Sequence, residues 1–240
     1  MLERDEYIVI LSLWKRAEWL KEQVEVFRSQ TIPPKEIWLS YGLNEQNTHL
    51  IKSDLMLLFD KIIILEDGGS VFSRFKFAKE SSEKLFLIID DDMFPTSNYM
   101  EQCLDFFKKN KDCIIASSGR MFKGEEYFPN DMYGSIKYSK STEIDIGTNG
   151  WFLSKESIKC LMDNHNRKNY NNCEDIALSY LNRKLRDVKT YVVEQNHSCN
   201  SDKYQHARGV GEEALSHASK HSLFYKQRNE VLNFYKNYEL

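Results

Sequence analysis

The stretch that most constrains the fold of this 240-residue chain is 85–95, where five apolar residues lead directly into three aspartates and a proline follows soon after. A short apolar run that ends in this way predicts a strand buried on both faces, as in a mostly parallel sheet. Ligands of such sheets bind beyond the carboxyl ends of the strands, and here that place holds Asp90, Asp91 and Asp92. Adjacent carboxylates repel one another, so a cation is expected to compensate them. A divalent metal that keeps several waters and also holds a substrate diphosphate is the simplest candidate.

The same acidic cluster has a second interpretation. An acidic turn at a strand end is often solvated, and Thr96, Ser97 and Asn98 could cap a helix over 98–109. The cluster alone therefore leaves a metal site and a solvated turn both open. Features elsewhere in the chain are needed to choose between them.

The composition favours one soluble domain and argues against nucleic acid and membranes as partners. A chain of this length with 41% hydrophobic residues can bury one sizeable core. The formal net charge is −3 and the basic residues are scattered, so neither nucleic acid nor an anionic membrane is expected as a partner. No stretch approaches the ~20 apolar residues of a membrane span. The charged start is unlike a secretory signal, so we expect a cytoplasmic protein.

The cysteines predict reduced thiols. Their number is odd, their spacing is wide, and no two of them form a C-x-x-C pair that would suit a zinc or redox site. We therefore expect most of them to be packing residues. The five are Cys103, Cys113, Cys160, Cys173 and Cys199.

The first half of the chain alternates strands with helices. Apolar runs predict four strands, at 7–13, 35–42, 61–65 and 85–89. The spacing of apolar residues predicts four helices, at 17–29, 50–59, 72–82 and 98–109. Strand–helix–strand order favours right-handed parallel crossovers. This alternation is typical of the nucleotide-binding half of an α/β domain.

After residue 110 the alternation loosens. The sequence predicts three strands, at 113–120, 143–153 and 188–193, and two helices, at 155–162 and 176–185. Residues 121–141 are expected to form a loop or hairpin, and 198–240 a polar tail. Glycines inside the segment 143–153 indicate a bulge or a close approach of the backbone to a ligand.

The order of these pieces resembles a glycosyltransferase of the GT-A fold. The resemblance rests on a DXD motif, Asp90-x-Asp92, after a buried strand, followed by the glycine–aromatic segment 147–152 and by Glu174-Asp175 at a helix start. It covers roughly residues 7–200. It implies a single α/β domain over 1–240, with a mostly parallel central sheet flanked by helices. Residues 1–110 would form the nucleotide-binding half, and 111–240 the acceptor half and tail.

Two branches of these enzymes are similar to the chain. The opening strand–helix–strand and the Glu174-Asp175 pair look like the large inverting family 2. Arg74-Phe75, the acidic triplet 90–92 and the segment 172–177 look like the exostosin-type retaining transferases. Family 2 members usually carry an aspartate at the end of the second strand, where this chain has Ser40-Tyr41-Gly42. The branch, and the contacts to the base of the nucleotide, therefore stay open.

The resemblance implies metal-dependent transfer of a sugar from a nucleoside diphosphate, with UDP expected, to a hydroxyl of a glycan or other acceptor. Loss of the diphosphate places negative charge on the leaving oxygens, which a metal stabilises as a Lewis acid. Asp92 and Asp90 would bind Mn²⁺ or Mg²⁺. His197 or His206 would add a ligand or a diphosphate contact, although packing is the competing account for a lone histidine.

The donor would also be contacted by basic and acidic residues near the strand ends. The guanidinium of Arg74 suits phosphate and hydroxyl recognition, with an exposed helix residue as the alternative account. Arg120 is a weaker candidate of the same kind, as is Arg16. The expected donor contacts are Leu13, Arg16, Asp67, Arg74, Asp90 and Asp91.

Asp175, with Glu174 beside it, is our prediction for the catalytic base. An inverting transfer needs a carboxylate to take the proton of the acceptor hydroxyl, and a helix N-terminus favours the ionised form. A structural acid in the first turn is the competing account. If transfer is retaining, the pair would orient the acceptor and stabilise an oxocarbenium ion. Gly150 and Trp151 are expected to contact the acceptor, with a buried core tryptophan as the alternative.

Two further classes of protein are possible alternatives. A nucleotidyltransferase usually carries a glycine-rich phosphate loop near the first strand, and residues 11–16 contain no glycine. A catalytically silent nucleotide- or glycan-binding module would keep the fold and lose the carboxylates, which are present here. Both observations favour the transferase.

Overall fold

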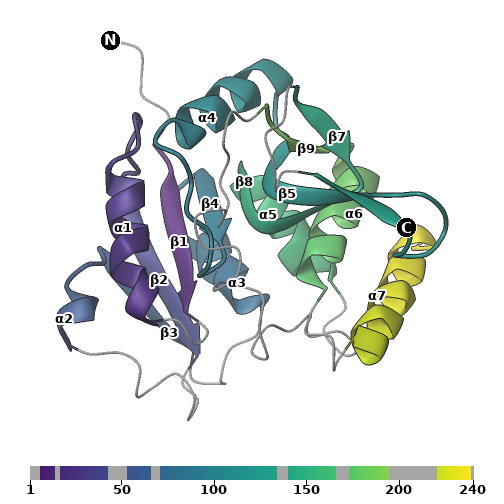
Figure 1. The fold of residues 1–240 in the computed structure, drawn as a ribbon, viewed down its shortest axis with the longest axis horizontal. Coiled ribbons are helices and arrows are strands. Elements are labelled where there is room, and N and C mark those ends of the chain that lie inside the picture. Colours follow the sequence, from purple (N-terminus) through teal and green to yellow (C-terminus); the bar gives the residue numbers. More distant parts are fainter. Residues whose placement is uncertain are drawn as a thin grey trace.

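A central sheet with helices on both faces forms the body of the protein (Figure 1). The computed structural model describes residues 6–13, 17–42, 53–65, 71–133, 140–165, 173–194 and 221–238. Within them the sheet has nine strands in the order β3-β2-β1-β4-β8-β5-β9-β7, and β6 pairs with β5 off this path. One sheet therefore runs through both halves of the chain.

The first half of the sheet is parallel, as the sequence predicts. β1 (Ile8–Leu13) lies between β2 (Glu36–Gly42) and β4 (Leu85–Ile89), and β2 also pairs with β3 (Lys61–Leu65). All three pairings are parallel. The carboxyl ends of these strands therefore lie at one edge of the sheet, where Asp90 follows β4.

The strands of this half are buried on both faces because their apolar side chains alternate between two cores. In β4, Phe86 and Ile88 belong to one core, and Leu87 and Ile89 to the other. All four are fully buried. The unbroken apolar run in the sequence thus fills both sides of one strand.

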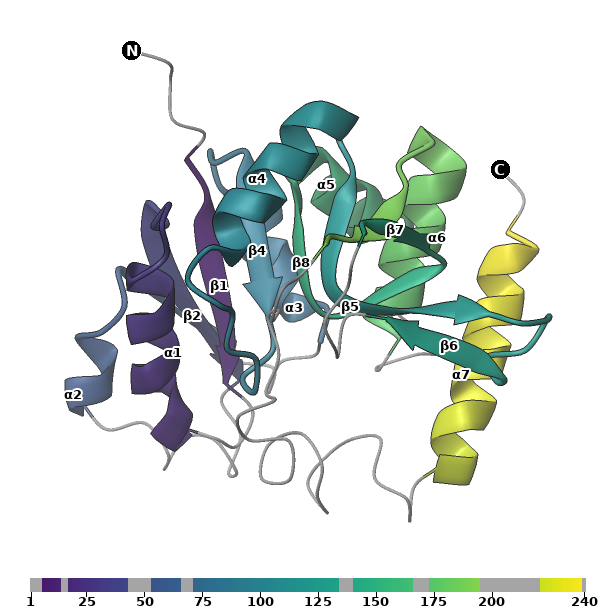
Figure 2. The same cartoon turned by 45° about the horizontal axis from the view of Figure 1, so that its top comes forward.

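Helices cover each core (Figure 2). A 3₁₀ turn η1 (Ala17–Trp19) leads into α1 (Leu20–Arg28), which with α4 (Tyr99–Asn110) covers the core that contains Leu87. The other core is covered, among the described residues, by four helices: α3 (Ser73–Glu80), α5 (Lys155–Asn164), α6 (Glu174–Arg186) and α7 (His221–Lys236).

The second half of the sheet is mixed, which corrects the expectation of a mostly parallel sheet. β8 (Ile146–Ser154) runs antiparallel to both of its neighbours, β4 and β5 (Ile114–Phe122). β9 (Thr190–Val192) is parallel to β5, while β7 (Thr142–Ile144) and β6 (Asn130–Tyr133) add antiparallel pairs. A parallel neighbour needs a long crossover, usually a helix, whereas β5 and β6 are joined by a short hairpin and therefore pair antiparallel.

Two predicted elements have different bounds. The helix expected over 50–59 is a single turn, α2 (Ser53–Met56), within the described residues. The strand expected over 143–153 is two strands, β7 and β8, which separate at Asp145 and join different neighbours. The hairpin expected within 121–141 is present as β5 and β6.

Helix α7 (His221–Lys236) lies in the segment that the sequence analysis left as a polar tail. It packs against α6 and passes beside the loop of the β5–β6 hairpin (Figures 1 and 2). The backbone N–H of Tyr127 in that loop donates to Asn229 Oδ1 over 2.7 Å, and Lys236 Nζ donates to the carbonyl of Glu125 over 2.7 Å. α7 therefore fastens the hairpin loop to the body of the domain.

Four cysteines lie in the described residues, and all four are free and buried, as predicted. Cys199 lies outside the described residues. Among the described helices, none is both long and apolar enough to cross a membrane.

We expect Leu232→Ala to lower the free energy of unfolding by about 2–5 kcal/mol, because this α7 leucine is fully buried in the core that α6 also lines. Leu223→Ala on the same helix is the matched control, since Leu223 is 61% exposed; it should change the free energy by less than about 0.5 kcal/mol. Urea unfolding followed by circular dichroism measures both. Equally small effects would show that α7 does not pack on the core.

Candidate active site

Arg74 joins the acidic end of β4 to the start of α6. Its Nη1 lies 2.5 Å from Asp90 Oδ1, and its Nη2 lies 2.7 Å from Glu174 Oε1. Its Nε donates to the carbonyl of Val71 over 3.1 Å, which fixes the plane of the guanidinium. The side chain is only 8% exposed, so Arg74 is not the exposed helix residue of the alternative account. One buried cation thus holds together the two acidic segments that the sequence analysis singled out.

The ring of Trp151 packs against this guanidinium. The Arg74 Cζ lies 4.9 Å from the centre of the Trp151 ring, within range of a cation–π contact. The indole Nε1 donates to the carbonyl of Gly147 over 2.9 Å, and the residue is 1% exposed. The ring therefore has no free face for a sugar in this structure. The expectation that Trp151 contacts the acceptor is therefore wrong for this structure. Trp151 is a core residue that packs against the Arg74 guanidinium.

Gly150 is packed tightly between neighbouring strands of the sheet, and its contact with an acceptor stays a prediction. A Cβ at this position would lie 2.9 Å from Ile89 Cγ1 on β4 and 3.2 Å from Ser117 Oγ on β5. The residue is buried between these neighbours. The predicted bulge does occur close by, because the pairing of β5 with β8 shifts register between Ala116 and Ser118. The close approach expected at the glycines is therefore to protein atoms.

Burial raises the pKa of Glu174 to about 7. The positive charge of Arg74 opposes this rise, while the negative charges of Asp175 and Asp90 add to it. The cause is that two carboxylates, Asp90 and Glu174, share one guanidinium in a poorly solvated place. A carboxyl whose pKa lies near neutrality is a common feature of functional sites.

Asp175 points to a different cation, Arg228 on α7. Its Oδ2 is paired with Arg228 Nη2, and its Oδ1 accepts from the backbone N–H of Ile176 over 2.8 Å. Arg228 is buried, with its guanidinium 4.6 Å from the Tyr127 ring and 5.0 Å from the Phe224 ring. Burial lowers the pKa of the Arg228 guanidinium, but Asp175, Tyr127 and Cys173 together outweigh burial, so the pKa is raised.

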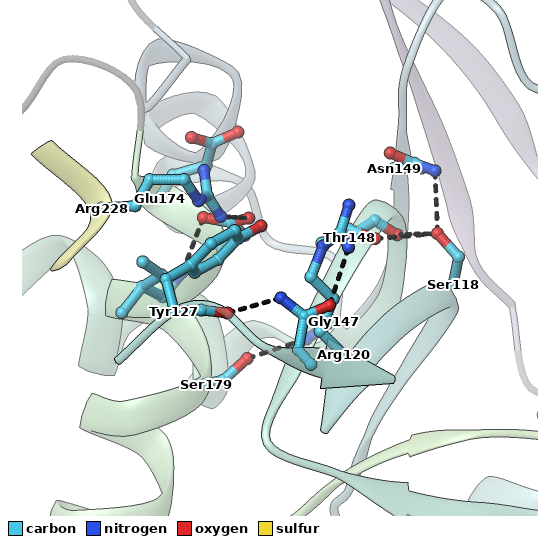
Figure 3. A network of polar contacts seen from close by, with 12 residues as sticks. Ser118, Arg120, Tyr127, Gly147, Thr148, Asn149, Glu174, Ser179 and Arg228 are labelled. Carbon is cyan, nitrogen blue, oxygen red and sulfur yellow. Dashed lines mark hydrogen bonds and ion pairs between the residues drawn. The ribbon is translucent and has the colours of Figure 1, made fainter. Parts of the chain in front are cut away.

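Figure 3 shows this side of the site, with Arg228 beside Glu174 and the ring of Tyr127. Burial raises the pKa of the Tyr127 hydroxyl, although the positive charges of Arg228 and Arg120 oppose the rise. Tyr127 is therefore a neutral ring wedged among charged groups. Arg120, a weaker donor candidate, lies on β5 and reaches toward the rings of Tyr127 and Phe128.

Gln23 on α1 fixes the acidic turn and was not predicted. Its Nε2 donates to the carbonyls of Asp90, over 2.8 Å, and Met93, over 2.9 Å. The side chain is fully buried. The available signal was an amide on the apolar face of a predicted helix, since a buried polar group needs partners.

Asn149 fixes the same turn from β8 and was also missed. Its backbone carbonyl accepts from the backbone N–H of Asp90 over 2.9 Å. Its side-chain Nδ2 donates to Ser118 Oγ over 2.8 Å (Figure 3). Its φ of 69° is left-handed, a conformation that asparagine tolerates better than most residues. An asparagine between two glycines inside a strand pattern was the signal for this turn.

The acidic turn suits a divalent cation that takes some of its ligands from the protein and the others from a substrate. Asp90 is one third exposed, and Asp92 is partly exposed beside it. No group of three metal-ligating side chains occurs within the described ranges. Mg²⁺ and similar ions are commonly held by one or two carboxylates plus waters and phosphate oxygens, so two carboxylates fit this chemistry.

Comparisons with known proteins identify the fold that carries these residues. No family model matches the chain. The crystal structure of S. aureus TarS 1-349 superposes with a TM-score of 0.57 at 13% identity, covering 82% of this chain and 60% of TarS 1-349. The chain has the GT-A fold of glycosyltransferases. The resemblance predicted from the sequence is thereby confirmed for the fold.

A second TarS structure and a curated relative extend the comparison. TarS 1-349 in complex with UDP-GlcNAc superposes with a TM-score of 0.54 at 12% identity, over 82% of this chain and 60% of that one. The glucosyl-dolichyl phosphate glucuronosyltransferase of Haloferax volcanii is 26% identical over 125 residues, which are 50% of this chain and 40% of the relative. The chain thus spans less than half the length of this glycosyltransferase.

Within the GT-A fold, the predicted site residues divide into three groups. Arg74, Asp90 and Glu174 come together, and Asp175 adjoins them on α6. Leu13 is buried at the end of β1, and Asp91 is buried at the end of β4, so their donor contacts remain predictions. Four predicted residues lie outside the described residues: Arg16, Asp67, His197 and His206.

We expect Glu174→Gln to change how stability depends on pH. The pKa of Glu174 is raised in the folded state, so between about pH 4.5 and 7 the folded protein binds more protons than the unfolded one, and the free energy of unfolding falls as pH rises. The Gln variant should lack this fall, which amounts to at most about 1.4 kcal/mol per pH unit for one proton.

Urea unfolding at pH 5, 6, 7 and 8 in the presence of a chelator measures the effect. Glu156→Gln is the control, because Glu156 is exposed on α5 and should keep the wild-type slope. If the slopes of the wild type and Glu174→Gln coincide, the charge assignment at Arg74 is wrong.

Proposed function

We propose that the chain is a metal-dependent glycosyltransferase that moves a sugar from a UDP-sugar to a hydroxyl of a glycan or other acceptor. The observation that carries the proposal is the bridge from Asp90 through Arg74 to Glu174, which unites a DXD turn with an acidic helix start in a GT-A fold. The relative's name, a glucuronosyltransferase, supports sugar transfer. TarS structures with UDP and UDP-GlcNAc support a UDP-linked donor.

On the donor side, Asp92 and Asp90 would hold Mn²⁺ or Mg²⁺. Such an ion supplies Lewis-acid stabilisation of the negative charge that the leaving diphosphate develops. Arg74 keeps Asp90 in place through one nitrogen and the start of α6 through another. Gln23 and Asn149 hold the backbone of the same turn. The protein thus presents its carboxylates on a fixed loop, as catalytic preorganisation requires.

On the acceptor side, Asp175 is the base we favour, with inversion at the anomeric carbon. Glu174 is paired with Arg74 on α3, whereas Asp175 is paired with Arg228 on α7. The start of α6 and the Arg228 guanidinium both place positive charge beside this carboxylate. The Asp175 side chain is 9% exposed, so an acceptor hydroxyl must share or replace the contact that Arg228 makes with Oδ2.

Calorimetric titration with UDP, GDP, CDP and dTDP, each with and without Mn²⁺, tests the donor side. We expect UDP to bind in a metal-dependent manner, and Asp92→Ala to abolish that dependence with little loss of stability, because removing one of three adjacent carboxylates relieves repulsion. Asp105→Ala, an exposed aspartate on α4, is the control. A folded Asp92→Ala protein that still binds UDP through the metal would refute this assignment.

We expect Asp175→Asn to keep UDP binding and to lower transfer by about 10²- to 10⁴-fold, the usual contribution of a general base. Release of UDP from UDP-GlcNAc and other UDP-sugars, with methyl glycosides as acceptors, measures transfer. Asp163→Asn is the control, since Asp163 is exposed at the end of α5 and paired with Lys79. Transfer at the wild-type rate in Asp175→Asn would make this residue a structural cap.

A further inference from the structure

The loop of the β5–β6 hairpin and helix α7 line an open cavity of about 300 Å³. Its lining residues are Glu126 and Phe128 from the loop, and Tyr225 and Asn229 from α7. We propose that this cavity binds one uncharged sugar ring of the acceptor. The proposal rests on the glycosyltransferase function proposed above and specifies where its acceptor sits.

The aromatic walls suit a sugar ring. The rings of Phe128 and Tyr225 lie 4.6 Å apart at 74°, so they meet edge to face and form a corner. Phe128 is 41% exposed, one of four large apolar side chains this exposed among the described residues. A pyranose presents an apolar face of C–H groups, which packs on an aromatic ring. Two rings at nearly a right angle would contact a face and an edge of such a sugar at once.

The polar groups of the cavity suit hydroxyls better than phosphate. Asn229 is held in place because its Oδ1 accepts from the backbone N–H of Tyr127. Glu126 supplies a carboxylate among the described lining residues, and the Arg120 guanidinium lies 5.8 Å from the Phe128 ring. A carboxylate and an amide bond well to neutral hydroxyls, whereas the Glu126 carboxylate repels a phosphate. A mainly apolar lining with a few fixed polar groups is the usual composition of small-molecule sites.

The cavity is built from the same two segments that hold Asp175. Arg228, which pairs with Asp175, precedes Asn229 on α7 and lies one turn after Tyr225. Tyr127, on which Arg228 stacks, immediately precedes Phe128 in the loop. A sugar in the cavity would therefore rest on residues adjacent in sequence to those that contact the base. This link ties occupancy of the cavity to the Asp175–Arg228 pair.

The volume limits the occupant to one ring. Sites for small ligands usually measure ~300–1,000 Å³, and this cavity lies at the lower end of that range. It can therefore take a single residue of a glycan and leave the rest of the acceptor outside. A long apolar chain would need a longer groove than these four residues line.

Saturation-transfer NMR with methyl glycosides of glucose, galactose and N-acetylglucosamine tests the proposal on the full chain. We expect transfer to the ring C–H protons of at least one glycoside, and a drop of at least fivefold in Phe128→Ala and in Tyr225→Ala. Leu223→Ala, which removes an exposed apolar side chain from the same helix outside the cavity, should keep the wild-type signal. UDP binding by calorimetry should be unchanged in all three variants.

The outcomes separate this proposal from the proposed function. Because Phe128 is exposed, its removal should leave the fold intact, and circular dichroism of each variant verifies this. No signal from any glycoside, or an equal signal in the wild type and Phe128→Ala, overturns the cavity assignment even if UDP still binds. A Phe128-dependent signal without UDP binding supports the assignment of the cavity as a sugar site and refutes the proposed transferase function.

Discussion

The structure depends on burying one guanidinium between two carboxylates. A charge removed from water is costly unless partners compensate it, and Arg74 finds its partners in Asp90 and Glu174, 16 and 100 residues away in the sequence. Forming this cluster requires α3, the end of β4 and the start of α6 to meet at one point. The same meeting brings the DXD turn to the acidic helix start, so the contact that pairs the buried charge also assembles the candidate site.

The second ion pair follows from the geometry of α6. Consecutive residues of a helix project about 100° apart, so Glu174 and Asp175 cannot serve the same neighbour. Glu174 meets Arg74 on α3, and Asp175 meets Arg228 on α7. Two adjacent acids therefore acquire different environments, which is the usual basis for different roles of like groups. It also explains why the last helix is part of the site.

How much could be predicted from the sequence depended on where each signal lies. β4 and its acidic turn were predictable because an apolar run buried on both faces leaves an unbroken pattern. Helix α7 was missed because Arg228 lies on its buried face among the apolar residues, which weakens the stripe that marks a helix. Asp175, the partner of Arg228, is distant in the sequence, so no local sequence pattern predicts the Asp175–Arg228 ion pair. The direction of β8 depends on the route of the chain, which periodicity does not record.

The error at Trp151 shows why aromatic residues near a site are hard to assign. A tryptophan beside glycines is equally consistent with a sugar platform and with a core residue, and the choice depends on what covers its ring. Here Arg74 covers it, because a cation shared by two carboxylates gains from a π-face beneath it. The exposed aromatic surface lies instead at Phe128, in a loop with no regular pattern.

The charges around Arg74 give the physical reason to place a further cation at the acidic turn. Asp90 and Glu174 together carry two negative charges against one positive charge, and burial makes that excess costly. The pKa of Glu174 is raised for this reason, since a proton taken up by Glu174 would remove the excess negative charge. A divalent cation near Asp90 would meet the same need, and it would leave Glu174 ionised and paired with Arg74. A site that gains from either a proton or a metal is well suited to a substrate that arrives as a metal–diphosphate complex.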